Sequence, residues 1–160
     1  MTITRALRMM FMAAALAACV STPATPERQD VDFVRGCWVD KDATDGRIDA
    51  LLRLLPAEPD ALEYSGDLDY VRGIRPGPQI GISIARDGTH ASVTQNGERT
   101  DLPAIADTTS IAKGSRQIVF GSIDSRTTRL EVAGTADTLT MTVFNGVSTL
   151  GFNGQRGGCD

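Results

Sequence analysis

Apolar and polar residues alternate with a period of two along most of the chain after residue 31. Ile80, Ile82 and Ile84 alternate with small residues, while Leu139 and Met141 are separated by a threonine. This alternation is typical of strands that bury one face. We therefore expect strands at 36–41, 47–55, 61–71, 79–86, 89–95, 116–124, 128–134, 138–145 and 148–154.

Turn residues separate these segments at short intervals. Asp87-Gly88 and Asn96-Gly97 supply the positive φ angles that tight hairpins need. Many short strands with such turns between them indicate an all-β fold. We predict a small antiparallel β-barrel with up-and-down topology, and a β-sandwich is the alternative.

Two segments are ambiguous. The leucines and isoleucine of residues 48–55 fit either one face of a helix or one side of a strand, and we favour a strand because its neighbours are strands. Residues 104–114 carry no clear period and predict a loop or a short helix.

The first residues have the character of an export signal. Arg5 and Arg8 precede an apolar run over 9–18, which is too short to span a bilayer as a helix. The run ends Leu16-Ala17-Ala18-Cys19, which resembles the lipobox of bacterial lipoproteins. The alternative is an ordinary secretory signal, cleaved earlier, that leaves Cys19 as an incidental thiol.

The lipoprotein resemblance implies three parts: a signal peptide at 1–18, a flexible Pro- and Thr-containing tether at 19–30, and one β-domain at 31–160. Cys19 would carry the acyl chains, palmitate among them, that anchor the protein in a membrane. Val20 stands where the enteric sorting rule places Asp in proteins kept at the inner membrane. The resemblance therefore implies an outer-membrane anchor, with the domain facing the periplasm.

Charge argues against one class of partner. The formal net charge is −4 and becomes −6 without the two arginines of residues 1–18. Nucleic-acid binding requires clustered Lys and Arg, and the domain has no basic run. We expect no nucleic-acid partner.

Cys37 and Cys159 remain once Cys19 is acylated, and an even pair in an oxidising compartment predicts a disulfide. Closing a loop of roughly 120 residues would stabilise the fold by about 4 kcal/mol in the chain-entropy model. A metal site or a reactive thiol are the rival interpretations. The disulfide requires the two ends of the domain to meet, which pairing of the first and last strands of a barrel achieves.

Gly36-x-Trp38 at the head of the first strand resembles the GxW motif of lipocalins and related barrels. The resemblance implies that Trp38 plugs the closed end of the barrel beneath a basic side chain from the last strand, for which Arg156 is the candidate. These three residues would be structural. The tyrosine that usually follows the tryptophan in the family is absent here, and so is a second lipocalin motif.

Four sequence patterns resemble metal-binding or catalytic motifs, but each lacks part of the motif. Asp40-Lys-Asp42-Ala-Thr-Asp45-Gly46 departs from calcium-loop spacing and fits an acidic hairpin turn. His90, the one histidine, is not tied by any motif to a nucleophile. Ser110-x-x-Lys113 lacks the elements that accompany it in β-lactamases. The alternating Glu63, Asp67 and Asp69 fit the solvent side of a strand better than a glycosidase pair. We expect no catalytic residue, metal or cofactor.

The expected function is that of a non-enzymatic envelope lipoprotein whose barrel binds a hydrophobic or amphiphilic ligand in its mouth. The alternative is a protein-interaction module, either an envelope assembly factor or an inhibitor of a hydrolase. A hydrolase that uses His90 is a third interpretation. The sequence leaves the first two open, because the inward-facing residues of a packed barrel and of a hollow one look alike.

Overall fold

The computed structural model describes residues 31–71, 79–105, 110–112, 115–121 and 127–159. Residues 1–30, where the signal peptide, the tether and the acylated Cys19 are expected, lie outside these residues. A short 3-10 helix, η1 (Asp32–Val34), precedes eleven strands. The strands are β1 (Gly36–Lys41), β2 (Ile48–Leu54), β3 (Glu63–Tyr70), β4 (Ile80–Ala85), β5 (His90–Gln95), β6 (Glu98–Pro103), β7 (Ser110–Ala112), β8 (Ser115–Gly121), β9 (Thr128–Gly134), β10 (Thr138–Asn145) and β11 (Thr149–Arg156).

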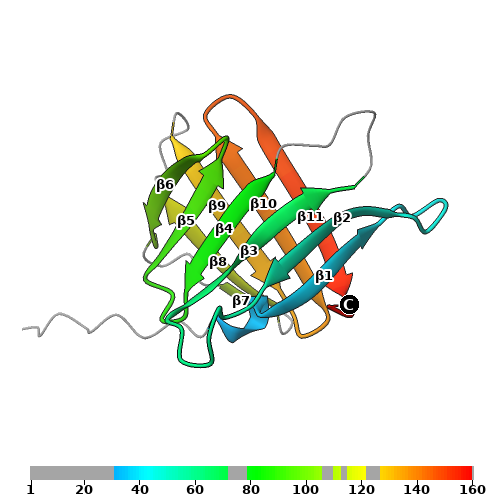
Figure 1. The fold of residues 1–160 in the computed structure, drawn as a ribbon, viewed down its shortest axis with the longest axis horizontal. Coiled ribbons are helices and arrows are strands. Elements are labelled where there is room, and N and C mark those ends of the chain that lie inside the picture. Colours follow the sequence, from blue (N-terminus) through cyan, green and yellow to red (C-terminus); the bar gives the residue numbers. More distant parts are fainter. Residues whose placement is uncertain (1–30, 72–78, 106–109, 113–114, 122–126, 160) are drawn as a thin grey trace, which may run out of the picture.

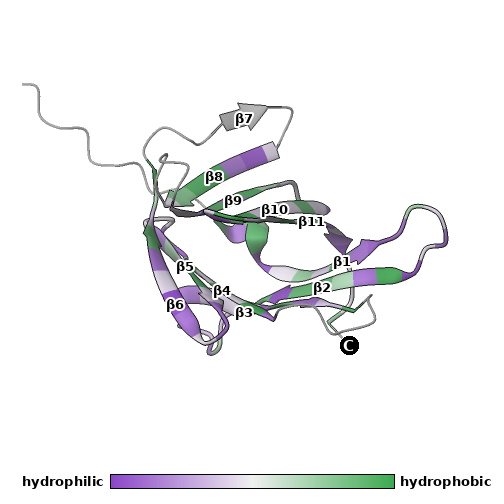
Figure 2. Ribbon diagram, turned by 90° about the horizontal axis from the view of Figure 1, so that it is seen from above, coloured by the Kyte–Doolittle hydropathy of each residue, from purple (hydrophilic) through white to green (hydrophobic). Residues whose placement is uncertain are grey.

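All the strands belong to one antiparallel sheet in the order β6-β5-β4-β3-β2-β1-β11-β10-β9-β8-β7. Strands that pair are consecutive in the chain except β1 and β11, whose pairing joins the two ends of the domain, and β6 and β7 are the edge strands of the sheet. The sheet curls until Ala104, just after β6, bridges Phe120 in β8, so the barrel is nearly closed (Figures 1 and 2). The prediction of a small antiparallel barrel is confirmed, and the sandwich alternative is not needed.

Alternation along the strands explains the curl. In β4 the isoleucines at 80, 82 and 84 point inward and are buried, and in β10 Leu139, Met141 and Val143 do the same. Hydrophobic burial of one face drives the sheet to wrap around a single core. In Figure 2 the wall β1–β5 faces the wall β8–β11 across this core.

Strand directions define two ends of the barrel. The closed end carries η1, the β2–β3 and β4–β5 connections, the β9–β10 turn and the C-terminal residues after β11. The opposite end, the mouth, carries the β1–β2, β5–β6 and β10–β11 turns. At the β5–β6 turn Asn96 and Gly97 have φ angles of 54° and 81°, as the Asn-Gly pair predicts for a tight hairpin.

Nine strands were predicted near their observed positions, and residues 48–54 form a strand rather than a helix. Two strands were not predicted. Residues 98–103 form β6, and residues 110–112, which we expected in a loop or helix, form β7. β6 is mostly polar and β7 has only three residues, so an apolar period marks neither strand.

Pairing of β1 with β11 brings Cys37 and Cys159 together. Their Cα atoms are 5.3 Å apart across 122 residues of sequence, and their sulfur atoms form the expected disulfide. Gly157 donates a backbone hydrogen bond to the Cys37 carbonyl at 2.9 Å, and Arg53 donates one to the Cys159 carbonyl at 2.6 Å. The segment after β11 is therefore held against β1 and β2.

Candidate functional site

The closed end is filled by Trp38, which has no solvent exposure. Its indole Nε1–H donates to the Val34 carbonyl of η1 at 2.9 Å. The Arg156 guanidinium stacks over the indole, with Cζ 4.4 Å from the ring centroid. Arg156 also donates to the carbonyls of Ala136 and Arg35, at 2.6 and 3.1 Å. A cation over an indole contributes about 0.5–2 kcal/mol depending on burial.

Gly36 is required by this arrangement. Its φ of +149° lies in a region that side chains rarely adopt, and a Cβ there would approach Arg156 Nη1 to 2.5 Å. The glycine of the Gly36-x-Trp38 motif therefore leaves the space in which the arginine lies over the tryptophan. Every polar group named at this end has a partner within the protein, which fits a structural role.

The mouth is crossed by two hydrogen bonds between opposite parts of the barrel. The Tyr70 hydroxyl of β3 donates to the Gly151 carbonyl of β11 at 3.0 Å, and Asn145 of β10 donates to Gln95 of β5 at 3.3 Å. Burial raises the pKa of Tyr70, with a smaller contribution from the Asp40 carboxylate, so the phenol keeps its proton at neutral pH.

The interior is filled with large side chains. Trp38, Tyr64, Phe120 and Phe152 are all at most 1% exposed. Two hollows lie on the outer surface of β3–β6. They meet at Arg99, and both are shallow and open to solvent.

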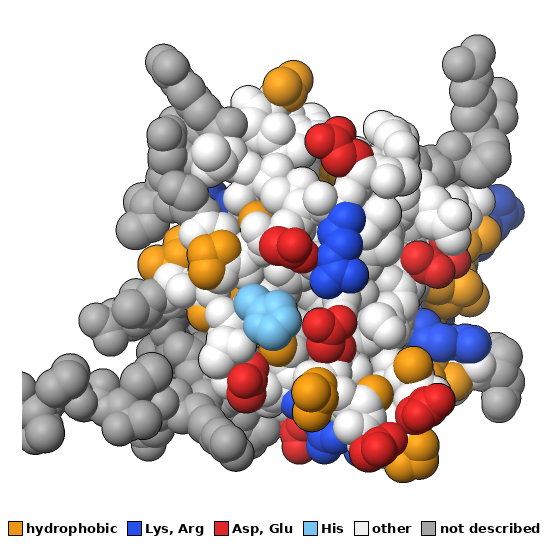
Figure 3. Space-filling view, turned by 60° about the vertical axis from the view of Figure 1, so that its left-hand side comes forward, with side chains coloured by type: hydrophobic (Ala, Val, Ile, Leu, Met, Phe, Trp, Pro, Cys, Tyr) orange, Lys and Arg blue, Asp and Glu red, His pale blue; other side chains and the backbone are white. Residues whose placement is uncertain are grey.

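The register of β3–β6 arranges the outward side chains of this face in three rows. From β3 to β6 the first row is Glu63, Ala85, His90 and Pro103, the second is Ser65, Ser83, Ser92 and Asp101, and the third is Asp67, Gly81, Thr94 and Arg99. Neighbouring strands lie about 4.8 Å apart, so side chains within a row are in reach of one another. Small hydroxyl side chains form the floor and charged side chains form the rim. We call the residues of the three rows the polar hollow; Figure 3 shows this face, with acidic and basic side chains around the histidine.

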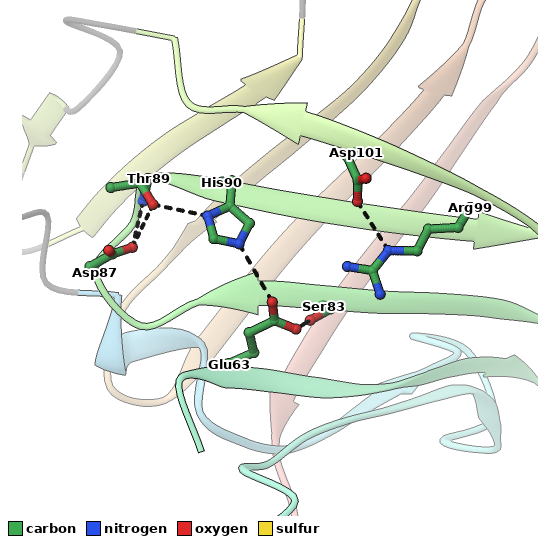
Figure 4. A network of polar contacts seen from close by, with 7 residues as sticks. All are labelled: Glu63, Ser83, Asp87, Thr89, His90, Arg99 and Asp101. Carbon is green, nitrogen blue, oxygen red and sulfur yellow. Dashed lines mark hydrogen bonds and ion pairs between the residues drawn. The ribbon is translucent and has the colours of Figure 1, made fainter. Parts of the chain in front are cut away.

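One edge of the polar hollow is an ordered chain of polar contacts (Figure 4). Ser83 donates a hydrogen bond to one carboxylate oxygen of Glu63, and the other oxygen lies 3.5 Å from His90 Nε2. His90 Nδ1 lies 2.9 Å from the Thr89 hydroxyl, which in turn donates to Asp87 at 2.7 Å. The Ser83 hydrogen bond, the interaction with His90 and the charge of Arg99 lower the pKa of Glu63 against the opposing effect of burial.

This chain of contacts does not activate a nucleophile. The Thr89 hydroxyl gives its proton to Asp87, so it can only accept a hydrogen bond from His90 and cannot be deprotonated by it. Ser83 donates to Glu63, whose lowered pKa makes it a weak base at neutral pH. In a Ser-His-acid triad the histidine lies between nucleophile and acid, whereas here the carboxylate lies between serine and histidine.

The acidic turn of the first hairpin uses its carboxylates locally. Asp42 accepts backbone N–H groups from Thr44 and Asp45, at 2.6 and 3.3 Å, and Asp45 accepts one from Arg47 at 3.0 Å. Such bonds are typical of Asx turns. In the described ranges no group of three or more His, Cys, Asp or Glu side chains could hold a metal ion.

The remaining two patterns are the Ser110-x-x-Lys113 motif and the alternating carboxylates of β3. Ser110 begins β7, and Lys113 lies outside the described residues. Glu63, Asp67 and Asp69 all lie on the outer side of β3, where the alternation places them. Glu63 contacts His90, while Asp67 leans towards Gly81 of the next strand.

Sequence reasoning singled out Glu63, Asp67 and His90 separately and missed the hydroxyl floor and Arg99–Asp101. The floor became visible only through the register of β3–β5. The Asn96-Gly97 turn could have predicted the strand that carries Arg99 and Asp101, because a tight hairpin turn requires a second strand after it. Arg99 and Asp101, joined at 3.0 Å, lie on that strand.

Comparison of the chain with protein-family models, with curated proteins and with solved structures returned no match in any of the three. The fold and polar hollow define the chain only as a small antiparallel β-barrel domain with a packed interior and a hydrophilic outer face. Across the stretches that the structure describes, there is no helix with the length and apolar character needed to traverse a membrane.

Proposed function

We propose that this protein is a non-enzymatic, lipid-anchored protein of the cell envelope that binds a partner protein through the outer face of β3–β6. The observation that carries the proposal is the contrast between a filled interior and a polar hollow outside it. The core side chains Trp38, Tyr64, Phe120 and Phe152 are at most 1% exposed, while both hollows open on the outer face.

The filled interior favours a partner protein over a small hydrophobic ligand. Ligand sites are usually enclosed and lined by apolar and aromatic side chains. In this barrel such side chains contact one another, and hydrogen bonds from Tyr70 and Asn145 cross the mouth. Hydroxyl and charged groups on an open sheet surface can instead pair with polar groups of a partner protein, directly or through bridging water, as at the polar rim of protein–protein contacts.

The absence of an enzymatic role in this proposal is supported by the direction of the hydrogen bonds around His90. Both hydroxyl groups near the Glu63–His90 pair donate to carboxylates, Thr89 to Asp87 and Ser83 to Glu63. General-base catalysis by His90 would require a hydroxyl that donates to its ring, and Glu63, the carboxylate to which Ser83 donates, is a weak base at neutral pH because its pKa is lowered. The hollow therefore has the polarity of a recognition surface.

The envelope location is supported by two independent features. Leu16-Ala17-Ala18-Cys19 supplies the acylation motif, and the Cys37–Cys159 disulfide fits an oxidising compartment. We propose an outer-membrane anchor with the domain facing the periplasm. Labelling of cells with an alkyne analogue of palmitate should mark the protein and leave its Cys19→Ser variant unmarked; a labelled Cys19→Ser variant, or an unlabelled parent, would contradict the anchor.

Site-specific photo-crosslinking in the native host tests the partner. A photoreactive phenylalanine at Ser65, an exposed position at the side of the hollow, should form a discrete adduct with one protein, identified by mass spectrometry. The same residue at Thr142, on the outer side of β10 in the opposite wall, is the matched control. Absence of an adduct at Ser65, or equal adducts at both positions, would reject the outer face of β3–β6 as the binding surface.

A further inference from the structure

The polar hollow has hydrogen-bonding capacity that the protein does not use. Ser92 is 3% exposed, yet its hydroxyl makes no hydrogen bond to the part of the chain that the structure describes. It lines the hollow together with Ser65 and Thr94, whose side chains are likewise unpaired within the described residues. The Ser92 oxygen keeps contact with solvent in the hollow, so it is free to accept a hydrogen bond from a bound group.

The charges of the hollow are unevenly compensated. Arg99 is engaged by Asp101 at 3.0 Å, and Glu63 is engaged by Ser83 and His90. The Asp67 carboxylate has neither an ion pair nor a hydrogen bond within the described ranges. With neutral His90, three carboxylates face one guanidinium, so the hollow is acidic.

Gly81 creates space beside the unpaired carboxylate. A Cβ at Gly81 would lie 3.6 Å from Asp67 Oδ1 and 3.7 Å from Thr94 Oγ1, so both oxygens border the space above the glycine. Ser83 and Ser92 lie in the adjacent row. A donor group above Gly81 would therefore meet one carboxylate and several hydroxyl oxygens.

We propose that this space binds a lysine or arginine side chain of the partner protein, with Asp67 as its counter-ion and Thr94 as a second acceptor. The inference rests on the proposed function, because it names the chemistry of the partner at that same face. A cation fits better than an anion, which would face Asp67 and Glu63, and better than an apolar group, which would leave the Ser92 hydroxyl unpaired.

The test uses the full mature chain with Cys19→Ser, which removes the acylation site and leaves every described residue unchanged. A capped tri-lysine peptide is titrated against it, and amide shifts are followed by NMR. The shifts should cluster at Gly81, Ser92 and Thr94. Asp67→Asn should weaken binding about three- to fivefold, the range of a partly exposed ion pair.

Asp69→Asn is the matched control, because Asp69 lies on the outer face of the same strand and outside the hollow. It should change the affinity for tri-lysine less than twofold, roughly the long-range contribution of one exposed charge. Gly81→Ser should abolish the clustered shifts while Asp67 stays in place, since the added side chain fills the space. Equal weakening by Asp67→Asn and Asp69→Asn, shifts that map elsewhere, or equally tight binding of capped tri-glutamate would overturn the inference.

Failure of this inference and failure of the proposed function give different results. If tri-lysine does not bind the hollow but the photoreactive residue at Ser65 still captures one partner, the binding surface stands and the cationic preference is wrong. If tri-lysine binds at Gly81 and the crosslink at Ser65 yields no adduct, the cation site stands and the partner-binding role is wrong.

Discussion

Polar side chains at the closed end of the barrel are hydrogen-bonded within the protein, whereas several in the polar hollow are not, in the part of the chain that the structure describes. At the closed end Trp38, Arg156 and Arg53 each donate to a backbone carbonyl, and a disulfide joins the same region. In the hollow, Ser92 and Asp67 have no partner within the described residues, although Ser92 is almost fully buried.

This difference indicates that the closed end contributes to stability and that the hollow is suited to recognition. Pairing within the protein lets buried polar groups add stability or cost little. The unpaired Asp67 and Ser92 oxygens in the hollow instead reach solvent, so they remain available to a second molecule at little cost to the folded protein. Variants at the closed end should therefore change stability, and variants in the hollow should change binding.

The largest effect should come from the plug. Trp38→Ala removes a fully buried indole and should lower the free energy of unfolding by about 3–5 kcal/mol, measured by guanidinium denaturation. Leu62→Ala, at a position that is 83% exposed, should change it by less than about 0.5 kcal/mol. If Trp38→Ala does not fold, Trp38→Phe gives a smaller loss of the same sign. A plug variant as stable as the parent would show that the closed end does not carry stability.

Loss of the disulfide should rank next. The double variant Cys37→Ser/Cys159→Ser should lose about 2–4 kcal/mol, because the bond closes a loop across 122 residues. Reductant added to the parent protein should produce the same loss and have no further effect on the double variant. A parent whose denaturation midpoint does not change on reduction would contradict the role of the bond.

Two hydroxyl deletions compare the regions directly. Tyr64 is buried at the closed end and donates to Asp32, and burial followed by this bond raises its pKa. Tyr64→Phe should therefore cost about 1–2 kcal/mol. Ser92→Ala, which removes a hydroxyl without a partner among the described residues, should be neutral within about 0.5 kcal/mol or stabilising. If Ser92→Ala is more destabilising than Tyr64→Phe, the proposed difference between the two regions is wrong.

The smallest effect should depend on pH. The pKa of Glu63 is lowered in the folded state, so its ionised form stabilises the fold above the unfolded-state value of about 4.3, and this is lost as pH falls through the lower folded value. Glu63→Gln should melt slightly below the parent at pH 7 and converge with it towards pH 3.

In a Ser83→Ala background, Glu63→Gln should change the melting temperature much less, because the Ser83 hydrogen bond is the largest cause of the lowered Glu63 pKa. Melting temperatures of the parent, the two single variants and the double variant are measured from pH 7 to pH 3. A gap that widens on acidification would reverse the sign of the linkage and contradict the assignment.

The strands that bury one face were predictable because their apolar residues recur with period two. The segment 48–54 shows the limit of this signal, since Leu51 and Ile48 also fit a helix. In the structure these two side chains are 39% and 41% exposed on the outside of β2, while Leu52 and Leu54 are buried. Pairing with β1 and β3, rather than local preference, decides that it is a strand.

β6 was missed for a related reason. Its residues are mostly polar, and Leu102 is its one buried side chain. It is a strand because the Asn96-Gly97 turn returns the chain along β5 and because Ala104, beyond its end, bridges β8. With β6 unpredicted, Arg99 and Asp101 could not be placed beside His90.

The sequence by itself determined which faces are buried and where the hairpins turn, since these follow from the local apolar period and from backbone freedom. Tertiary structure alone decided that the interior is filled, that β1 meets β11, and that Ser65, Ser83 and Ser92 stand side by side next to Asp67. The physical reason is register: side chains from strands distant in sequence become neighbours only when backbone hydrogen bonds set how far each strand slides along the next.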